Sequence, residues 1–271
     1  MSPLDDKLAQ LHAQLAGFGS VLVAFSGGVD STLLVKVAHD ALGEQALAVT
    51  GVSPSVPPSE VGEAEALATQ IGARFEAINT DEMADENYVS NPTNRCYFCK
   101  SELFTRLGRV ARERGINVIA DGFNADDVGD WRPGMMAAKE MGVHSPLKDA
   151  GLTKADIRAL SQRFGLPTWD KPAMACLSSR IPYGQRVTVE KLSRIDAAEQ
   201  FLRSLGFRIL RVRHSEDGAR IEVGTNEVAR LQAPDLLDRV TTRFAELGFA
   251  RVEVDPRGYR SGSLNEGVVR P

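Results

Sequence analysis

A short segment rich in glycine and serine is the part of this sequence best suited to phosphate chemistry. It reads Ser26-Gly27-Gly28-Val29-Asp30-Ser31, between an apolar run and a helical apolar pattern. Two glycines let the backbone turn sharply near phosphate oxygens, and the first amides of a helix bind anions. The serine hydroxyls can add hydrogen bonds, whereas Asp30 suits a Mg²⁺ ion that bridges phosphates. The segment therefore predicts an ATP site with magnesium. A plain strand-to-helix turn capped by Ser and Asp is the alternative.

The three cysteines form the second group with chemical potential. Cys96 and Cys99 make a Cys-x-x-Cys pair, which alone fits redox chemistry, zinc or no function. A structural zinc site takes four protein ligands, and the four histidines are scattered. Three thiolates suit a 4Fe–4S cluster with one iron open. Cys176 lies in a loop near Arg180, an arrangement that favours a thiolate, although a lone cysteine is usually a small buried residue.

Other polar segments follow predicted strands. Asp121-Gly122-Phe123-Asn124-Ala125-Asp126-Asp127 lies at the carboxyl edge expected to bind ligands, or is a simple acidic turn. Lys148 can approach a phosphate or remain a solvated surface lysine. Arg211 and Arg213 share a strand face by their spacing, and guanidinium groups match phosphate oxygens. Trp131 either lines a site entrance or packs.

Apolar periodicity predicts the elements that position these residues. A helix covers residues 4–17, and further helices cover a region after Ser31, residues 59–72 and about 100–115. Short strands rich in β-branched residues alternate with them. This order predicts an α/β fold with a doubly wound, mainly parallel sheet. The strands span Ser20–Phe25, Ala46–Val52, Arg74–Asn79 and Val118–Ala120.

The pattern changes near residue 185. A helix (about 188–205), a hairpin (Arg208–His214 and Arg220–Val223), a helix (about 226–247) and a strand (Ala250–Val254) predict a small α+β unit. We therefore expect a first domain over residues 1–184 and a second, for acceptor binding or oligomerisation, over 185–271.

Composition narrows the classes of function. The net charge is −4 and the sequence pI about 5.7, which argues against a nucleic-acid partner. No apolar run reaches the ~18 residues that span a bilayer, and the N-terminus lacks the pattern of a signal peptide. We expect a cytoplasmic protein that does not bind membranes.

The Ser26–Ser31 segment resembles the PP-loop of ATP pyrophosphatases. Together with the Asp121–Asp127 segment, the Cys176-Leu177-Ser178-Ser179-Arg180 segment and the small C-terminal unit, the chain resembles the LarE family over essentially its whole length. That family comprises ATP-dependent sulfurtransferases that help build the nickel-pincer nucleotide cofactor of lactate racemase. The resemblance implies adenylation of pyridinium-3,5-biscarboxylic acid mononucleotide, a small nucleotide substrate, and its conversion to a thiocarboxylate. It also implies a homo-oligomer.

The resemblance implies roles for particular residues. ATP is expected at Ser26, Gly27, Gly28, Asp30, Ser31, Gly122 and Asn124, with Mg²⁺ at Asp30. The acceptor is expected at Ser179, Arg180, Glu199, Arg211 and Arg213. Three-cysteine members carry a 4Fe–4S cluster, so the hypothesis is that Cys96, Cys99 and Cys176 ligate one that delivers sulfide from a donor. The alternative is that Cys176 gives up its own sulfur while Cys96 and Cys99 are inert.

Three other functions stay open on sequence alone. A tRNA thiolase combines a PP-loop, adenylation and cysteine sulfur, but the acidic charge and the lack of a recognisable basic RNA module oppose it. A nucleotide-binding sensor or scaffold would lack catalysis. An amide-forming synthetase such as NAD synthetase would leave the three cysteines without a role.

Overall fold

The structure is a computed structural model that describes residues 2–129, 133–172, 175–216, 218–260 and 262. Trp131 lies outside these residues. The chain divides into two compact units. The first contains Met1–Tyr88 and Asn94–Met174, and the second contains Val89–Thr93 and Ala175–Pro271. Residues 175–184 thus group with the second unit, while the expected domain boundary at residue 184 stays a prediction.

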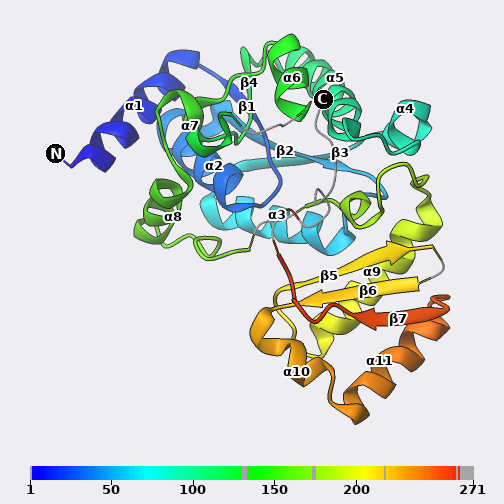
Figure 1. Ribbon diagram of the computed structural model, residues 1–271. Coiled ribbons are helices and arrows are strands. Elements are labelled where there is room, and N and C mark those ends of the chain that lie inside the picture. The colour runs from blue at the N-terminus through cyan, green and yellow to red at the C-terminus, as the bar shows by residue number, and fades with distance from the viewer. Residues whose placement is uncertain (1, 130–132, 173–174, 217, 261, 263–271) are drawn as a thin grey trace. The chain divides into compact units, whose positions relative to one another are not determined.

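A four-stranded parallel sheet forms the centre of the first unit, in the order β3-β2-β1-β4 (Figure 1). A bridge between Ala120 and His144 extends its β4 edge. The α/β fold with a parallel sheet flanked by helices is therefore confirmed. Its strands are β1 (Val21–Ala24), β2 (Ala46–Val52), β3 (Arg74–Asn79) and β4 (Val118–Ala120).

Apolar side chains point to both faces of this sheet, so helices cover both (Figure 1). Val21 and Val23 belong to one buried cluster, and Leu22, between them, belongs to the other. This is the continuous apolar pattern expected of a buried parallel strand. The first face carries α1 (Pro3–Phe18), α2 (Val29–Leu42), α3 (Pro58–Ile71), α7 (Pro146–Asp149) and α8 (Lys154–Arg163); the second carries α5 (Arg95–Arg114) and α6 (Pro133–Glu140). The short α4 (Glu86–Val89) precedes α5.

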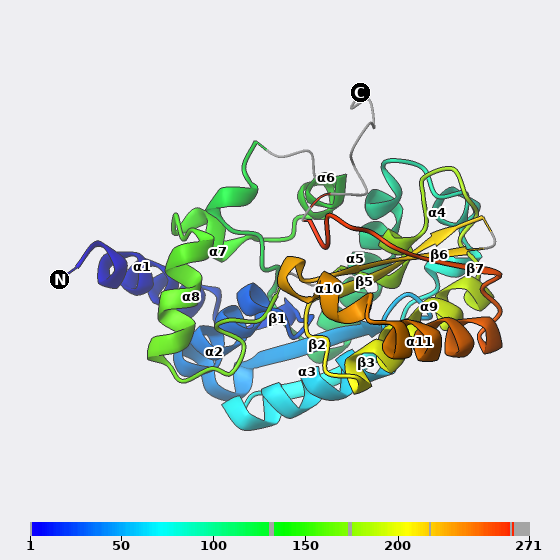
Figure 2. The same cartoon turned by 60° about the horizontal axis from the view of Figure 1, so that its bottom comes forward.

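The second unit contains a three-stranded sheet, in which β5 (Leu210–Ser215) and β6 (Gly218–Val223) form an antiparallel hairpin and β7 (Arg251–Val254) runs parallel to β6. One sheet face packs against α9 (Val189–Ser204), α10 (Val228–Leu231) and α11 (Pro234–Glu246), which can be followed in Figure 2. Because side chains alternate along a strand, the opposite face carries polar groups. These include Arg211, Arg213, Arg220, Glu222 and Glu253.

Two predicted helices differ from the observed ones. The continuous helix expected over 226–247 is wrong, because the chain forms α10 and then restarts at Pro234 as α11. Proline lacks an N–H and is favoured at a first helical position. The helix expected from about residue 100 begins at Arg95 instead, so the Cys-x-x-Cys pair is helical. Among the described residues, no helix is long and apolar enough to cross a membrane.

Candidate active site

The Ser26–Ser31 loop lies where the strand order of the first sheet reverses. β1 has β2 on one side and β4 on the other, so the chain winds outward in both directions from β1. In open α/β sheets, ligands bind at the carboxyl ends of strands at such a switch point. The loop follows β1 and leads directly into α2, and the Asp121–Asp127 segment follows β4. The topology therefore brings two sequence-predicted segments to one edge.

The backbone of the loop is shaped as an anion cradle. Gly27 has φ +66°, a left-handed conformation that suits glycine. Gly28 precedes α2 as its N-cap without a side-chain cap bond, so the helix presents backbone N–H groups at its positive end. Ser31 Oγ accepts from Ser26 N at 3.3 Å and lies 3.1 Å from Ser26 Oγ. These serine contacts hold the loop in a tight turn around the start of the helix.

Asp30 is the acidic centre of this loop, and two groups from later in the chain meet its carboxylate. Asn124 Nδ2 donates to Asp30 Oδ1 at 3.2 Å, and the Lys154 ammonium pairs with Asp30 Oδ2. One carboxylate beside a phosphate cradle fits the way Mg²⁺ is usually held, with nucleotide phosphates and water as its other ligands. Asp30 would hold the ion, which would neutralise phosphate charge.

Two lysines at this loop were missed by the sequence analysis. Lys154 begins α8, where its backbone N–H also bonds Asp126 Oδ2 at 2.8 Å. Lys171 Nζ donates to the carbonyl of Gly27 at 3.2 Å and to Glu63 at 2.9 Å. The capping box that starts at Thr153 signals the start of a helix, but it does not predict that Lys154 lies beside Asp30. Lys148, which the sequence suggested as a phosphate ligand, is partly exposed, and its Nζ lies 3.6 Å from Asp149 Oδ1.

The segment after β4 approaches the loop closely. A Cβ atom at Gly122 would lie 3.1 Å from Ser31 N, so only glycine fits without a shift. Asp121 is buried, and its Oδ1 accepts from Ser145 Oγ at 2.8 Å and Phe123 N at 3.2 Å. Its Oδ2 has no hydrogen-bond partner among the described residues. Burial raises the pKa of Asp121, against the opposing effect of these hydrogen bonds.

The Cys-x-x-Cys pair lies in the first two turns of α5. Cys96 is exposed and Cys99 is partly exposed, and their i, i+3 spacing puts both on one side of the helix, as two ligands of one metal group require. Cys176 belongs to the second unit. No group of three or more His, Cys, Asp and Glu side chains suited to a metal ion occurs among the residues that the structure describes. The shared ligation of a cluster stays a prediction.

Cys176 immediately precedes a single 3₁₀ turn, Leu177–Arg180, in the second unit. Leu177 and Ser178 are buried, whereas Cys176 is partly exposed. Ser179 N donates to the carbonyl of Cys176 at 3.0 Å. Downstream, the buried side chain of Asn91 donates to the carbonyls of Ile181, Pro182 and Gln185 at 3.3, 2.7 and 3.0 Å. The cysteine thus stands at the accessible end of a well-bonded segment.

Arg180 and Glu199, both predicted to bind the acceptor, pair with each other. Arg180 Nε and Nη2 donate to Glu199 Oε1 and Oε2 at 2.8 and 3.0 Å, and the two side chains are 2% and 0% exposed. Glu199 also accepts from Val212 N at 3.1 Å and Arg203 Nη2 at 3.0 Å. Burial opposes ionisation of Glu199, but the charge and hydrogen bonds of Arg180 outweigh it, so its pKa lies below its ordinary value.

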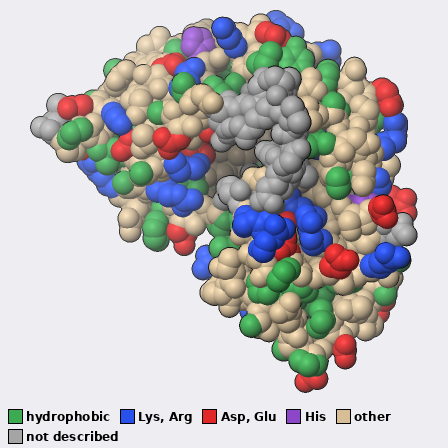
Figure 3. All heavy atoms as spheres, viewed as in Figure 1, with side chains coloured by type: hydrophobic (Ala, Val, Ile, Leu, Met, Phe, Trp, Pro, Cys, Tyr) green, Lys and Arg blue, Asp and Glu red, His purple; other side chains and the backbone are tan. Residues whose placement is uncertain are grey.

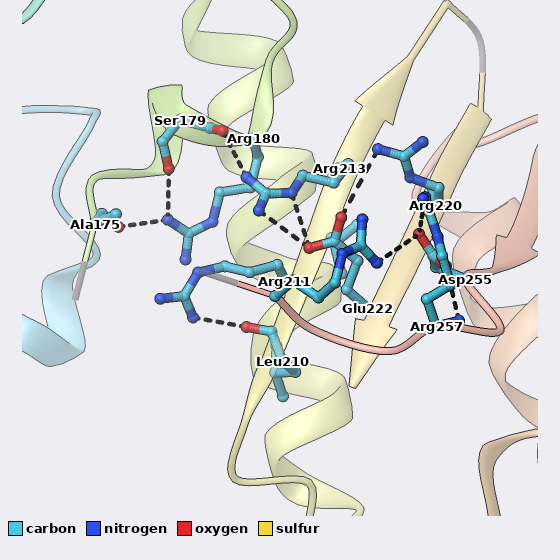
Figure 4. A network of polar contacts seen from close by, with 12 residues as sticks. Ala175, Ser179, Arg180, Leu210, Arg211, Arg213, Arg220, Glu222, Asp255 and Arg257 are labelled. Atoms are coloured by element: carbon cyan, nitrogen blue, oxygen red, sulfur yellow. Dashed lines mark hydrogen bonds and ion pairs between the residues drawn. The ribbon is translucent and has the colours of Figure 1, made fainter. Parts of the chain in front are cut away.

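Arg211 and Arg213 lie on the polar sheet face, as their spacing predicted (Figure 4). Arg213 donates to Glu222 Oε2 from Nε and Nη2 at 3.1 and 3.0 Å. Arg211 lies over the ring of Tyr259, with 5.1 Å from Cζ to the ring centroid, and donates to the carbonyl of Leu210 at 2.7 Å. Burial, and then repulsion from Arg180, lower the pKa of Arg211.

Positive charge is concentrated on this face. Arg213 and Arg220 are directly opposite in the β5–β6 register, and like charges in that arrangement destabilise a sheet. Figure 3 shows basic side chains gathered above these strands on the visible face of the second unit. A cavity of about 130 Å³ opens there, lined by three arginines, Arg180, Arg213 and Arg220, and by one carboxylate, that of Glu253, among other residues. Such a face is suited to an anionic ligand.

The chain is similar to known proteins over part or all of its length. A family model described as NAD synthase matches residues 4–115. An uncharacterised protein of Synechocystis sp. is 48% identical over 267 residues, 98% of this chain and 100% of that protein. The pyridinium-3,5-bisthiocarboxylic acid mononucleotide synthase of Lactiplantibacillus plantarum is 38% identical over 271 residues, 100% of this chain and 98% of that protein. A tRNA-specific 2-thiouridylase of Rickettsia peacockii is 25% identical over 191 residues, 56% of this chain and 52% of that protein.

Proposed function

This chain belongs to the family of pyridinium-3,5-bisthiocarboxylic acid mononucleotide synthases, and from that premise we propose that it is an ATP-dependent sulfurtransferase. Its acceptor is pyridinium-3,5-biscarboxylic acid mononucleotide, whose carboxylates become thiocarboxylates in nickel-pincer nucleotide synthesis. The observation that carries the proposal is the 38% identity over the whole chain. The PP-loop at the switch point of the sheet supports it independently.

The first step is activation of a carboxylate. A carboxylate oxygen of the acceptor attacks the α-phosphorus of ATP, the bond between the α-phosphorus and the bridging oxygen breaks, and pyrophosphate leaves. The loop amides and the Ser26 and Ser31 hydroxyls bind the phosphates. Asp30 would hold a Mg²⁺ ion, which would offset phosphate charge. Lys154 and Lys171, whose ammonium groups lie at the loop, are added to the predicted ligands. Gly122 and Asn124 complete the nucleotide site.

The second step transfers sulfur. In the sacrificial form, the Cys176 thiolate attacks the acyl carbon and AMP leaves with the bonding electron pair. Removal of the Cys176 Hα then breaks the Cβ–Sγ bond, so the thiocarboxylate departs and dehydroalanine remains. A second round on another protein molecule gives the bisthiocarboxylate. The partial exposure of Cys176 supports its access to an activated acceptor.

The other form assigns Cys96, Cys99 and Cys176 to a 4Fe–4S cluster with sulfide from a donor. Such a cluster would supply exchangeable sulfide without loss of protein sulfur. The test is anaerobic purification with measurement of iron, sulfide and the visible spectrum. A protein that stays iron-free after reconstitution excludes the cluster form, and loss of the elements of H₂S from its intact mass after one turnover supports the sacrificial form.

Acceptor binding divides the predicted residues into two groups. Arg211, beside Tyr259 and among several guanidinium groups whose repulsion is relieved by an anion, is the principal ligand proposed for the acceptor phosphate. Ser179 adds a hydroxyl. Arg180 and Glu199 bond to each other, and Arg213 bonds to Glu222. Their contact with the acceptor is therefore a proposal that competes with a role inside the fold.

A tRNA acceptor is the second candidate, because the tRNA-specific 2-thiouridylase matches 56% of this chain. The net charge of −4 weighs against tight binding to a phosphate backbone. The experiment is pyrophosphate release from ATP with Mg²⁺, measured with the pyridinium dicarboxylate nucleotide and with unmodified tRNA. Release stimulated by the nucleotide alone supports the proposal. Pyrophosphate release stimulated by tRNA alone supports the tRNA thiolase instead. Release that neither acceptor stimulates favours a nucleotide sensor.

A further inference from the structure

Two arginines in the second unit bond to the backbone of the turn that carries Cys176 (Figure 4). Arg180 Nη1 donates to the carbonyls of Ala175 and Cys176, the latter at 2.9 Å, and to Ser179 Oγ at 3.1 Å. Arg213 Nη1 donates to the carbonyl of Ser179 at 2.8 Å. The reactive cysteine and the end of its 3₁₀ turn are thus bonded to guanidinium groups from two different elements.

Each of these arginines is itself fixed by a buried glutamate. Glu199 on α9 and Glu222 on β6 are 0% and 1% exposed. Glu199 accepts from two nitrogens of Arg180, and Glu222 accepts from two nitrogens of Arg213. The Arg180–Glu199 pair is bidentate, which fixes the plane of the guanidinium group. Both nitrogens of Arg213 donate to the single oxygen Oε2 of Glu222, which holds that end of the Arg213 side chain. The remaining nitrogen of each arginine is then directed at the Cys176 turn.

We propose that Arg180 and Arg213 are positioning residues, which Glu199 and Glu222 hold in place so that the Cys176 turn keeps one conformation. The proposal rests on the proposed role of Cys176 in sulfur transfer. It revises the expectation that both arginines mainly clamp the acceptor phosphate. All three nitrogens of each guanidinium group donate to protein oxygens, so a phosphate would meet groups that are already bonded to buried carboxylates and to the turn.

Desolvated ion pairs add little stability compared with apolar packing, so we assign these pairs a role in holding the geometry of the turn. Reacting atoms must approach within ~3–3.5 Å, and a displacement of about 1 Å can reduce a rate 100-fold. Ala175 and Cys176 have no buried apolar side chain that could hold this part of the turn by packing. The hydrogen bonds from Arg180 and Arg213 restrict its displacement instead.

The test compares anchor variants with matched controls that change another bond to the same glutamate. Glu199→Gln is paired with Arg203→Gln, because Arg203 bonds Glu199 from a side chain that is 39% exposed. Glu222→Gln is paired with Arg220→Gln, because Arg220 lies 3.7 Å from Glu222 and is 44% exposed. Iodoacetamide alkylation of iron-free protein is followed for each cysteine by peptide mass spectrometry. Cys96, in the first unit, serves as the internal reference.

Loosening of the turn predicts that Cys176 alkylation rises several-fold in both anchor variants, while the Cys96 rate and both controls stay at the wild-type value. Equal Cys176 rates in anchor and control variants overturn the proposal. If either anchor variant is unfolded by circular dichroism, Arg180→Lys replaces it, since lysine offers one nitrogen where Arg180 uses three to reach Glu199 and the turn carbonyl of Cys176.

Kinetics separate positioning from phosphate binding. Positioning predicts that Glu199→Gln lowers the rate of the first turnover by about 100-fold with an unchanged KM for the acceptor. A raised KM with an unchanged rate contradicts it and restores the phosphate-clamp role. Alkylation does not depend on sulfur transfer. A Cys176→Ala variant that keeps activity would refute the proposed sulfur role while the alkylation result still decides the positioning of the turn.

Discussion

Replacement of Glu199 by Gln tests the buried pair as a determinant of stability. Glu199→Gln keeps the size of the side chain but leaves Arg180 charged in a site where it is 2% exposed. Removing one partner of a buried ion pair costs about 3–5 kcal/mol. For a unit of about 100 residues that corresponds to a fall in Tm of roughly 12–40 °C. Arg203→Gln, at a side chain 39% exposed, should cost less than about 1 kcal/mol.

The difference in stability between wild type and Glu199→Gln should depend on pH in a defined direction. Although burial opposes ionisation, Arg180 keeps the pKa of Glu199 below its ordinary value of 4.5, so the folded state holds that proton less tightly than the unfolded chain. The stability advantage of wild type over Glu199→Gln is therefore complete above pH 4.5. It is lost as pH falls through the lower pKa of the folded state.

The assay must report on the second unit. Both tryptophans, Trp131 and Trp169, belong to the first unit, so calorimetry and hydrogen exchange replace tryptophan fluorescence. The amide of Val212, which donates to Glu199 Oε1 at 3.1 Å, is a direct exchange probe. The reasoning is refuted if Glu199→Gln and Arg203→Gln lose equal stability, or if the advantage of wild type grows as the solution becomes more acidic.

Three further changes test the rest of the site. Lys154→Met removes a charged partner of the loop, so ATP should bind about 10–100-fold more weakly by calorimetry. The free energy of unfolding should fall by less than about 1 kcal/mol. An unchanged ATP affinity would contradict a role of Lys154 in phosphate binding. Gly122→Ala places a Cβ atom 3.1 Å from Ser31 N, so ATP affinity should fall, while Gly108→Ala, whose Cβ atom would make only an ordinary contact at 3.6 Å from Arg112 Nη1, leaves it unchanged. Equal ATP affinities of the two variants would show that the loop moves to accept the methyl group. Arg211→Gln should raise the KM for the acceptor about 10–100-fold at constant turnover, and a change in turnover alone excludes phosphate binding.

Local chemistry explains what the sequence predicted. The Ser26–Ser31 loop was identifiable because its glycines, serines and aspartate lie next to one another, and the strand that precedes it is a continuous apolar run. The first sheet followed from alternation of strands and helices, and the predicted β2, β3 and β4 match the observed bounds. These features depend on neighbours in sequence.

Long-range contacts explain what it missed. Lys154 meets Asp30 across 124 positions, and no periodicity specifies such a meeting. Arg180 and Glu199 were each identified, but separately and as acceptor ligands, because residue type does not reveal that a carboxylate 19 positions away will be buried against the arginine. Glu222 carried no signal beyond its place in a strand. The break at Pro234, by contrast, was readable from the missing N–H of proline.

The most direct measurement is mass spectrometry of the acceptor after incubation with ATP, Mg²⁺ and this protein, in iron-loaded and iron-free forms. Pyridinium-3,5-biscarboxylic acid mononucleotide should gain sulfur in place of a carboxylate oxygen, with AMP and pyrophosphate formed in equal amounts and no product without ATP. An unchanged acceptor with both forms of a folded, ATP-binding protein would contradict the assignment as a sulfurtransferase.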